Sequence, residues 1–220
     1  MFVFPMSLRS TPGTRGLTLA TERQTQAERR EAAERAILEA AKTIVAERGL
    51  DELTLGEVGE AAGYSRALPA HYFGTKNAML HALADFIVAE YSRRVRSGPI
   101  ATQGLQRLID VIVFCADDAE RDPATVRVYQ ALLGAGLTRS DLRSLGARIT
   151  QQAVEDIAVL IREARDLGDI RPDVDARTEA SLIVAALRGV LFQWLINPDH
   201  VSLARMRDTL TRNVRSALAA

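Results

Sequence analysis

Apolar residues recur along most of this chain every three or four positions, which is the spacing of one face of an α-helix. The first such segment begins at Thr25, three residues before Glu28, and ends at Gly49. Threonine and glutamate at this spacing predict a capping box, and the glycine predicts a left-handed C-cap. The apolar face of this first helix consists of Ala33, Ile37, Ala40, Ala41, Ile44 and Val45.

The same pattern divides the rest of the chain into further helices. Thr54 predicts the cap of a short second helix that ends before Gly63, and Ser65 predicts the cap of a third. The helices after the first are expected near residues 54–62, 65–73, 76–97, 102–119, 123–134, 140–167, 175–196 and 203–218. No alternating strand pattern of useful length is present, so we expect an all-α fold of about nine helices.

Pro69 indicates where the third helix begins. A proline inside a helix costs about 3 kcal/mol, whereas in the first turn it removes an N–H group that has no partner within the helix. The proline therefore favours a helix that starts at Ser65 or Arg66, after a tight turn at Gly63. Two short helices joined in this way behind a longer one are typical of a helix-turn-helix, whose last helix enters the DNA major groove.

Residues 35–80 contain Ile37-Leu38-x-Ala40-Ala41, Gly49, Thr54 with Val58, Ala62-Gly63-x-Ser65, Tyr72-Phe73, Lys76 and Leu80. As a set, these features resemble the DNA-binding domain of the tetracycline-repressor (TetR) family of transcriptional regulators. Pro69, Ala70 and the order His71-Tyr72 depart from the family pattern, which more often has an aliphatic residue, an aromatic residue and an aromatic-His order there. Gly56 stands where some members carry a basic residue that contacts bases. The fold assignment survives these departures, but the target DNA sequence cannot be predicted.

The candidate DNA contacts lie around the third helix. Arg66 at its start is expected to bond to guanine or to a phosphate, with a solvated surface position as the alternative. Phosphate contact is the main expectation for His71 and Tyr72, with core packing as the alternative, and a phosphate is also expected at Lys76. The full predicted set is Thr54, Ser65, Arg66, Ala67, His71, Tyr72 and Lys76.

Charge gives this prediction little support. The chain has 28 basic and 28 acidic residues, so binding to a polyanion depends on where the charges lie. Residues 28–81 contain 7 basic and 9 acidic residues, a net charge of −2. Residues 1–24 are expected to form a flexible arm that is disordered or touches DNA, with Arg9, Arg15 and Arg23 against Glu22 giving it a net charge of +2.

Several other classes of protein are disfavoured. The single Cys115 fits a reducing compartment and the apolar core, no membrane span or signal peptide is expected, and a cytoplasmic location follows. The three histidines have no metal-ligand spacing, and no acid–base or nucleophile arrangement stands out. We therefore expect no cofactor, no metal and no enzymatic activity.

The last two helices carry more apolar residues than one core-facing stripe requires, which predicts an isologous dimer through a four-helix bundle. The expected interface residues are Leu182, Ala186, Gly189, Val190, Leu210 and Val214. The resemblance also implies a small-molecule pocket between the middle helices, for which plain core packing is the alternative. The candidates are Phe114, Tyr129, Gln130, Leu133, Arg188, Phe192 and Trp194, and Arg188 is expected to pair with an acid such as Asp110 or Glu179, to face solvent, or to bind an anionic ligand.

Together these observations predict three segments: a flexible arm over residues 1–24, a helix-turn-helix domain over 25–75, and an effector-binding and dimerisation domain over 76–220. The expected function is that of a dimeric regulator, a repressor that a small effector releases from double-stranded operator DNA when the fourth helix tilts. An all-α interaction module that does not bind DNA is the alternative, and a small helical enzyme is a third. The sequence reveals neither the operator nor the effector, and it does not separate repression from activation.

Overall fold

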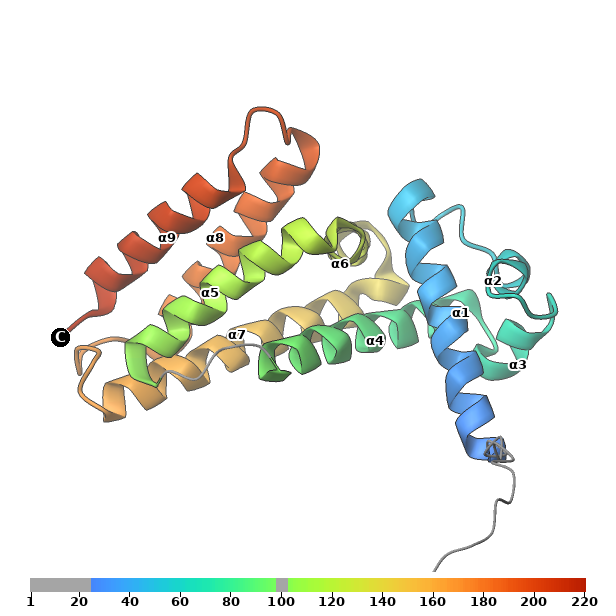
Figure 1. Cartoon of the computed structure of the whole chain (residues 1–220), viewed down its shortest axis with the longest axis horizontal. Coiled ribbons are helices and arrows are strands. Elements are labelled where there is room, and N and C mark those ends of the chain that lie inside the picture. The colour runs from blue at the N-terminus through green and yellow to red at the C-terminus, as the bar shows by residue number, and fades with distance from the viewer. Residues whose placement is uncertain (1–24, 98–102) are drawn as a thin grey trace, which may run out of the picture.

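A computed structural model describes residues 25–97 and 103–220. Within these residues every regular element is helical, and no β-strand forms. A head of three helices lies at one end of the molecule, and the later helices form an elongated body (Figure 1). α4 belongs to both parts, because it leaves the head and runs along the body (Figure 1). The elements are α1 (Gln26–Arg48), α2 (Leu55–Ala61), α3 (Leu68–Phe73), α4 (Lys76–Ser97), α5 (Gly104–Arg121), α6 (Pro123–Thr138), the 3₁₀ turn η1 (Ser140–Leu142), α7 (Arg143–Asp166), α8 (Ala176–Ile196) and α9 (Leu203–Leu218).

Most of the predicted helix starts are confirmed by side-chain caps. Thr25 and Glu28 form both hydrogen bonds of the capping box, and Gly49 ends α1 with a φ of 88°. The side chains of Thr54, Asp175 and Ser202 accept hydrogen bonds from the backbone N–H three residues further on. These polar side chains satisfy N–H groups that a helix cannot bond internally, which is why the helices begin at these residues.

The predicted start of the third helix is wrong by about three residues. α3 begins at Leu68, with Ala67 at the N-cap and Pro69 in the second helical position. Ser65 lies in the preceding turn, where its carbonyl oxygen accepts the N–H of Leu68 at 3.1 Å. Because proline suits the first turn of a helix and has no N–H to contribute, Pro69 sets the start later than the serine cap suggested.

Three other boundaries differ from the prediction. The segment predicted to begin at residue 102 begins at Gly104, after residues 98–102, which are outside the described residues. α6 continues four residues beyond 134, to Thr138. The helix predicted over 140–167 starts as a separate 3₁₀ turn before α7 begins at Arg143. The predicted arm at residues 1–24 is also outside the described residues.

The core has two large parts, and α4 and α7 contribute residues to both of them. One cluster packs Ile37, Ala41 and Val45 of α1 against α4 and against Val128 and Leu132 of α6. The other lies between α5, α7 and α8 and includes Leu108, Ile112 and Ile161. Because α6 contributes to the same cluster as α1, the head is packed on the body through apolar contacts as well as through α4.

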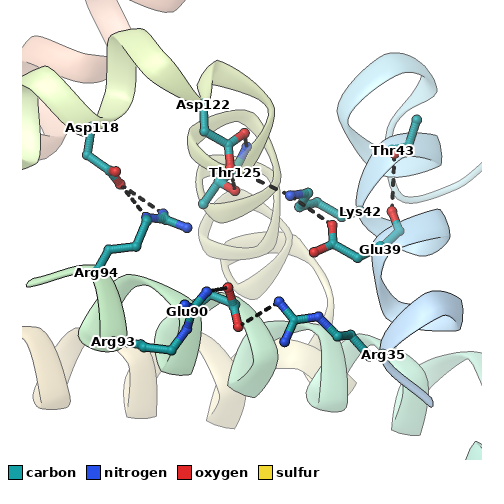
Figure 2. A network of polar contacts seen from close by, with 10 residues as sticks. All are labelled: Arg35, Glu39, Lys42, Thr43, Glu90, Arg93, Arg94, Asp118, Asp122 and Thr125. Carbon is teal, nitrogen blue, oxygen red and sulfur yellow. Dashed lines mark hydrogen bonds and ion pairs between the residues drawn. The ribbon is translucent and has the colours of Figure 1, made fainter. Parts of the chain in front are cut away.

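Polar contacts cross the same boundary between head and body, and Figure 2 shows them. Arg35 of α1 pairs with Glu90 of α4 at 3.2 Å. Lys42 of α1 lies 3.5 Å from a carboxylate oxygen of Asp122, the residue that caps α6. We call these two ion pairs the head–body contacts, and they tie α1 to both α4 and α6.

Candidate nucleic-acid interface

The tight crossing of α2 and α3 depends on Gly59. A Cβ atom built at this position would lie 2.5 Å from the Ser65 carbonyl oxygen and 3.0 Å from Cδ of Pro69. The glycine is buried in the crossing, and Pro69 is the buried residue of α3. Glycine therefore allows the backbone of α2 to approach the turn and the first residues of α3 closely enough to form the helix-turn-helix.

The outer side of α3 is open to solvent. Ser65, Arg66, Ala67 and His71 are exposed, whereas Tyr72 is partly buried against the head core. A six-residue helix with small or polar outward residues fits the major groove, whose width is about 12 Å. The structure thus leaves the predicted base-reading residues accessible.

Arg66 is held by a neighbour on α2. Its Nη1 lies 2.7 Å from Oε2 of Glu60, and both side chains are more than half exposed. The guanidinium also lies over Gly56, where a Cβ atom would be 3.2 Å from Nη2. The hydrogen bond that Arg66 donates to the Glu60 carboxylate raises the pKa of Arg66. Arg66 therefore points along α2, and a contact with DNA requires it to exchange or share this carboxylate.

A second group of cations lies where the N-terminal part of α1 faces the end of α3. The guanidinium carbon of Arg30 is 5.6 Å from the centre of the Tyr72 ring. The rings of His71 and Tyr72 meet edge to face with their centres 6.0 Å apart. These side chains border a hollow of about 400 Å³ lined by Gln26, Arg29, Arg30, Ala33, Tyr64, Leu68, His71 and Tyr72. The arrangement offers cations and hydroxyl and imidazole groups to a phosphate backbone.

Thr54 and Lys76 flank the head at its other helix ends. The Thr54 hydroxyl caps α2 by accepting the N–H of Glu57 at 3.2 Å. The Lys76 ammonium group, at the first residue of α4, donates to the backbone carbonyl of Asp51 at 2.8 Å. An ammonium group bonded to a neutral carbonyl keeps its charge and two further N–H donors, so Lys76 retains the capacity to meet a phosphate.

The body holds the predicted effector residues in different places. Arg188 of α8 donates to the hydroxyls of Tyr129 at 2.7 Å and Thr150 at 3.0 Å. Gln130 donates to the backbone carbonyl of Arg188 at 3.1 Å. The expected pairing of Arg188 with Asp110 or Glu179 is therefore wrong, because the side chain turns from α8 toward α6 and α7 and meets hydroxyl groups.

The aromatic candidates are divided between the interior and the surface. The Phe114 ring packs 6.0 Å from that of Tyr91, and Trp194 packs against a small third cluster that contains Ala116 and Leu203. Leu133 is partly buried against the head cluster. Phe192 does not face the interior, because its residue is 52% exposed on α8.

The predicted dimer residues are also divided. Leu182 is 59% exposed, and a Cβ atom at Gly189 would meet no atom within 4 Å. Val214 instead packs inside the second core cluster, since α9 turns this residue toward the chain's own interior, and Leu210 packs partly against that cluster. The large exposed apolar residues of α8 are Leu182, Phe192 and Ile196, and with Gly189 they form what we call the α8 face.

α8 is apolar well beyond the needs of the core. It is the one described helix that is long and apolar enough to cross a membrane by length and composition alone, and 22% of its apolar window is buried. A core helix can pass the same test, so one such helix is weak evidence for a span. Among the described residues, no group of three His, Cys, Asp or Glu side chains is arranged to hold a metal ion.

Sequence reasoning missed two residues of the head. Gly59 gave no signal distinct from that of any helical glycine, although its place on α2 facing the turn is what the crossing requires. Glu60 was read as one of many acids, yet it is the residue that holds Arg66. Glu60 and Arg66 are six residues apart across a turn, and this spacing indicates a contact only once the geometry of the turn is known.

Comparisons with known proteins cover both halves of the chain. Residues 37–83 match the model of bacterial regulatory proteins of the tetR family, and residues 104–219 match that of the BetI-type transcriptional repressor C-terminal region. The chain is 26% identical over 175 residues to the transcriptional regulator TtgR of Pseudomonas putida, covering 76% of this chain and 82% of TtgR. It is 30% identical over 153 residues to the nucleoid occlusion factor SlmA of Haemophilus influenzae, covering 68% of each. A TetR-family structure from Rhodococcus sp. superposes with a TM-score of 0.79 at 24% identity, covering 86% of this chain and all 100% of that one.

Proposed function

Because this chain belongs to the TetR family of bacterial transcriptional regulators, we propose that it is a cytoplasmic, dimeric repressor that leaves its operator when a small molecule binds the body. Residues 25–75 form the DNA-binding domain, and residues 76–220 form the effector-binding and dimerisation domain. The observation that carries the proposal is the head geometry, in which a short, open α3 stands on a glycine-dependent crossing with α2.

DNA binding uses α3 and the helix ends around it. Arg66 and Ala67 face the base edges, since they precede the first turn of α3 and are exposed. Ser65, His71, Tyr72, Lys76 and Thr54 contact phosphates, assisted by Arg30 beside Tyr72. Phosphate contacts fix the orientation of the head, and the base contacts supply specificity.

The dimer forms through the α8 face. Two copies of α8 bring Leu182, Phe192 and Ile196 out of water, and Gly189 allows the two helices to approach closely. An isologous contact of this kind places two heads on the same side of the DNA, where they read half-sites about 34 Å apart.

The head–body contacts carry the effector signal. Lys42 is bound to Asp122 at the start of α6, and Arg35 is bound to Glu90 in the middle of α4 (Figure 2). A ligand between α5, α6, α7 and α8 that shifts α6 or α4 therefore moves α1, and with it the angle of α3. Coupling between two sites of this kind is typically about 1–3 kcal/mol.

A binding selection tests the proposal. The purified full chain is mixed with a random double-stranded DNA library, and the recovered sites are measured by fluorescence anisotropy. We expect a two-fold symmetric site, bound at least about 10³ times more tightly than unrelated DNA. Arg66→Ala should weaken the selected site by about 1–3 kcal/mol while the circular dichroism spectrum stays unchanged. Recovery of unrelated sequences with no preference would favour the interaction module.

A further inference from the structure

Arg188 brings a positive charge into the contact region of α6, α7 and α8. Its Nη2 donates to the Tyr129 hydroxyl at 2.7 Å, and its Nη1 donates to the Thr150 hydroxyl at 3.0 Å. Its guanidinium carbon lies 5.4 Å from the centre of the Tyr129 ring. Both hydrogen-bond acceptors are uncharged hydroxyl groups, so they orient the guanidinium without neutralising it.

The guanidinium has unused binding capacity. Its Nε–H is buried and has no hydrogen-bond partner among the described residues. Within residues 25–97 and 103–220, Arg188 forms no ion pair with a carboxylate, whereas Arg94, the partly buried arginine of α4, is paired with Asp118 at 2.8 Å. A partly buried cation without an anion is costly, and an unmade hydrogen bond adds to that cost. The site therefore lacks a negative partner.

Beside Tyr129, the described residues of the neighbouring helices present a phenol and a thiol rather than an unpaired carboxylate. Tyr91 of α4 and Cys115 of α5 are hydrogen bonded to each other. Burial raises the pKa of Cys115 to about 11 and that of Tyr91 well above its ordinary value, so both groups are neutral at pH 7. Burial also raises the pKa of Tyr129, although the neighbouring Arg188 acts in the opposite direction. Phe114 packs against the ring of Tyr91, and Leu187, the chain neighbour of Arg188, is partly buried against the second core cluster.

We propose that the effector is a small, mainly apolar molecule carrying an oxyanion group, either a carboxylate, a sulfonate or a phosphate, and that Arg188 binds this group. The Nε–H and an Nη–H of one guanidinium edge form the parallel pair of hydrogen bonds that an oxyanion accepts. Tyr129 and Thr150 hold the guanidinium in place for this contact. The inference rests on the proposed function, since it names the chemistry of the ligand that the body is proposed to bind.

Tyr129 connects this contact to the DNA-binding head. It lies on α6, and the first turn of the same helix is capped by Asp122, which is bound to Lys42 of α1. An anion that draws the guanidinium toward itself also pulls on the Tyr129 hydroxyl bonded to it, and so shifts α6. The shift reaches the head through a helix that is already tied to it.

Two fluorescent probes of nearly equal shape test the proposal on the full chain. Anilinonaphthalene sulfonate carries a sulfonate, and N-phenyl-1-naphthylamine is its uncharged analogue. We expect the wild type to bind the sulfonate at least about tenfold more tightly than the neutral probe, and Arg188→Met to remove that preference. Arg148→Met is the matched control, because Arg148 has a 52% exposed side chain and pairs with Asp85. It should leave the preference unchanged.

Competition supplies a measurement that needs no variant. Sodium octanoate should displace the sulfonate probe from the wild type, and octanamide at the same concentration should not. Equal binding of the two probes, equal displacement by acid and amide, or an unchanged preference in a folded Arg188→Met would each overturn the proposal. The same samples are assayed for DNA binding. A wild type that binds its selected site but shows no charge preference overturns the anion site alone, and an Arg188-dependent preference without DNA binding overturns the proposed function alone.

Discussion

Gly59 and Ser65 approach each other so closely that a single added methyl group on the glycine would lie 2.5 Å from the serine carbonyl oxygen. Real side chains do not tolerate this distance, and the obstructing atom is backbone that carries the turn into α3. The nearest comparison is Gly56, three residues earlier on α2. A Cβ atom there would be 3.2 Å from Nη2 of Arg66, the end of a flexible side chain that can move away.

Gly59→Ala is therefore expected to destabilise the head, and Gly56→Ala is not. Alanine gains about 0.5–1 kcal/mol over glycine in a helix, and at residue 59 this gain is outweighed by an overpacking cost of about 1–3 kcal/mol or more. Urea unfolding followed by circular dichroism measures the difference in free energy of unfolding between the two variants. Equal stability of both would mean that α2 and α3 do not cross as closely as described.

The ion pair between Glu60 and Arg66 predicts that Glu60 weakens DNA binding. Glu60→Gln removes the charge that holds the guanidinium, and with it one negative charge beside a residue that is proposed to contact DNA. We expect tighter binding to the selected site by a factor of about three to ten and a steeper dependence of affinity on salt, since Arg66 then approaches the bases as an unpaired cation within the field of the phosphates. Anisotropy titrations at several salt concentrations measure both effects.

Glu155→Gln is the control for this prediction. Glu155 pairs with Arg162 on α7, in the body of the molecule, and both side chains are similarly exposed. Its replacement removes an equal charge far from the head and should leave the affinity within error of the wild type. If Glu60→Gln instead binds DNA more weakly, the Glu60 carboxylate holds Arg66 in the position from which it contacts a DNA base.

The amino-acid pattern predicted the fold well where a residue acts within its own helix. Thr25 and Thr54 cap the helices that they were expected to cap, because a cap depends on residues only three positions apart. Ser65 had the same local appearance and was outweighed by Pro69, whose ring fixes the backbone in the first turn. The serine cap and the proline position favour different first residues for α3, and the sequence pattern does not show which of the two dominates.

Contacts between distant segments could not be predicted in the same way. The partners of Arg188 are 38 and 59 residues away, on α7 and α6, and both are hydroxyl groups that carry no charge to attract attention in the sequence. Val214 was expected at an interface because it is apolar, but the rotation of α9 decides whether such a residue faces its own core or a partner. That rotation is set by the packing of α9 against α5, and the spacing of residues within α9 carries no information about this contact.

The carboxylate of Asp122, which accepts hydrogen bonds from Thr125 and pairs with Lys42, predicts a specific dependence of stability on pH. Burial alone would raise the pKa of Asp122, but hydrogen bonds from Thr125 and the charge of Lys42 outweigh it, so the pKa is lowered. A lowered carboxyl pKa contributes stability that is present above the unfolded value and lost as pH falls through the folded value. Asp122→Asn keeps the capping oxygen and loses this contribution.

The measurement is the free energy of unfolding of both proteins from about pH 6 down to about pH 3. The wild type should exceed Asp122→Asn at the upper end, and the difference should shrink below about pH 4 as Asp122 takes up a proton. Other acids with lowered pKa values, such as Glu90, affect both proteins alike and cancel in the difference. A difference that stays constant over the whole range would show that the ionised form of Asp122, hydrogen bonded to Thr125 and paired with Lys42, adds nothing to folding.

The α8 face predicts which substitutions separate the dimer into single chains. Phe192 is 52% exposed in the isolated chain, so Phe192→Arg costs the fold little and places a charge in the proposed interface. Gly189→Leu tests close approach, because a side chain there meets no atom within 4 Å in its own chain. The dissociation constant of the dimer should be at least about a hundredfold higher in both variants than in the wild type, as expected when a central anchor is lost. Sedimentation velocity measures this shift.

Leu137→Arg is the control for the dimer, because Leu137 is 81% exposed on α6 and lies outside the α8 face. It introduces the same charge at a still more exposed leucine and should leave the sedimentation coefficient unchanged. The dissociated variants should also bind a symmetric site no more tightly than a half-site, since a single head gains nothing from the second half. If Phe192→Arg and Gly189→Leu remain dimers while Leu137→Arg does not, the two copies meet through α6, and the apolar surface of α8 needs another occupant.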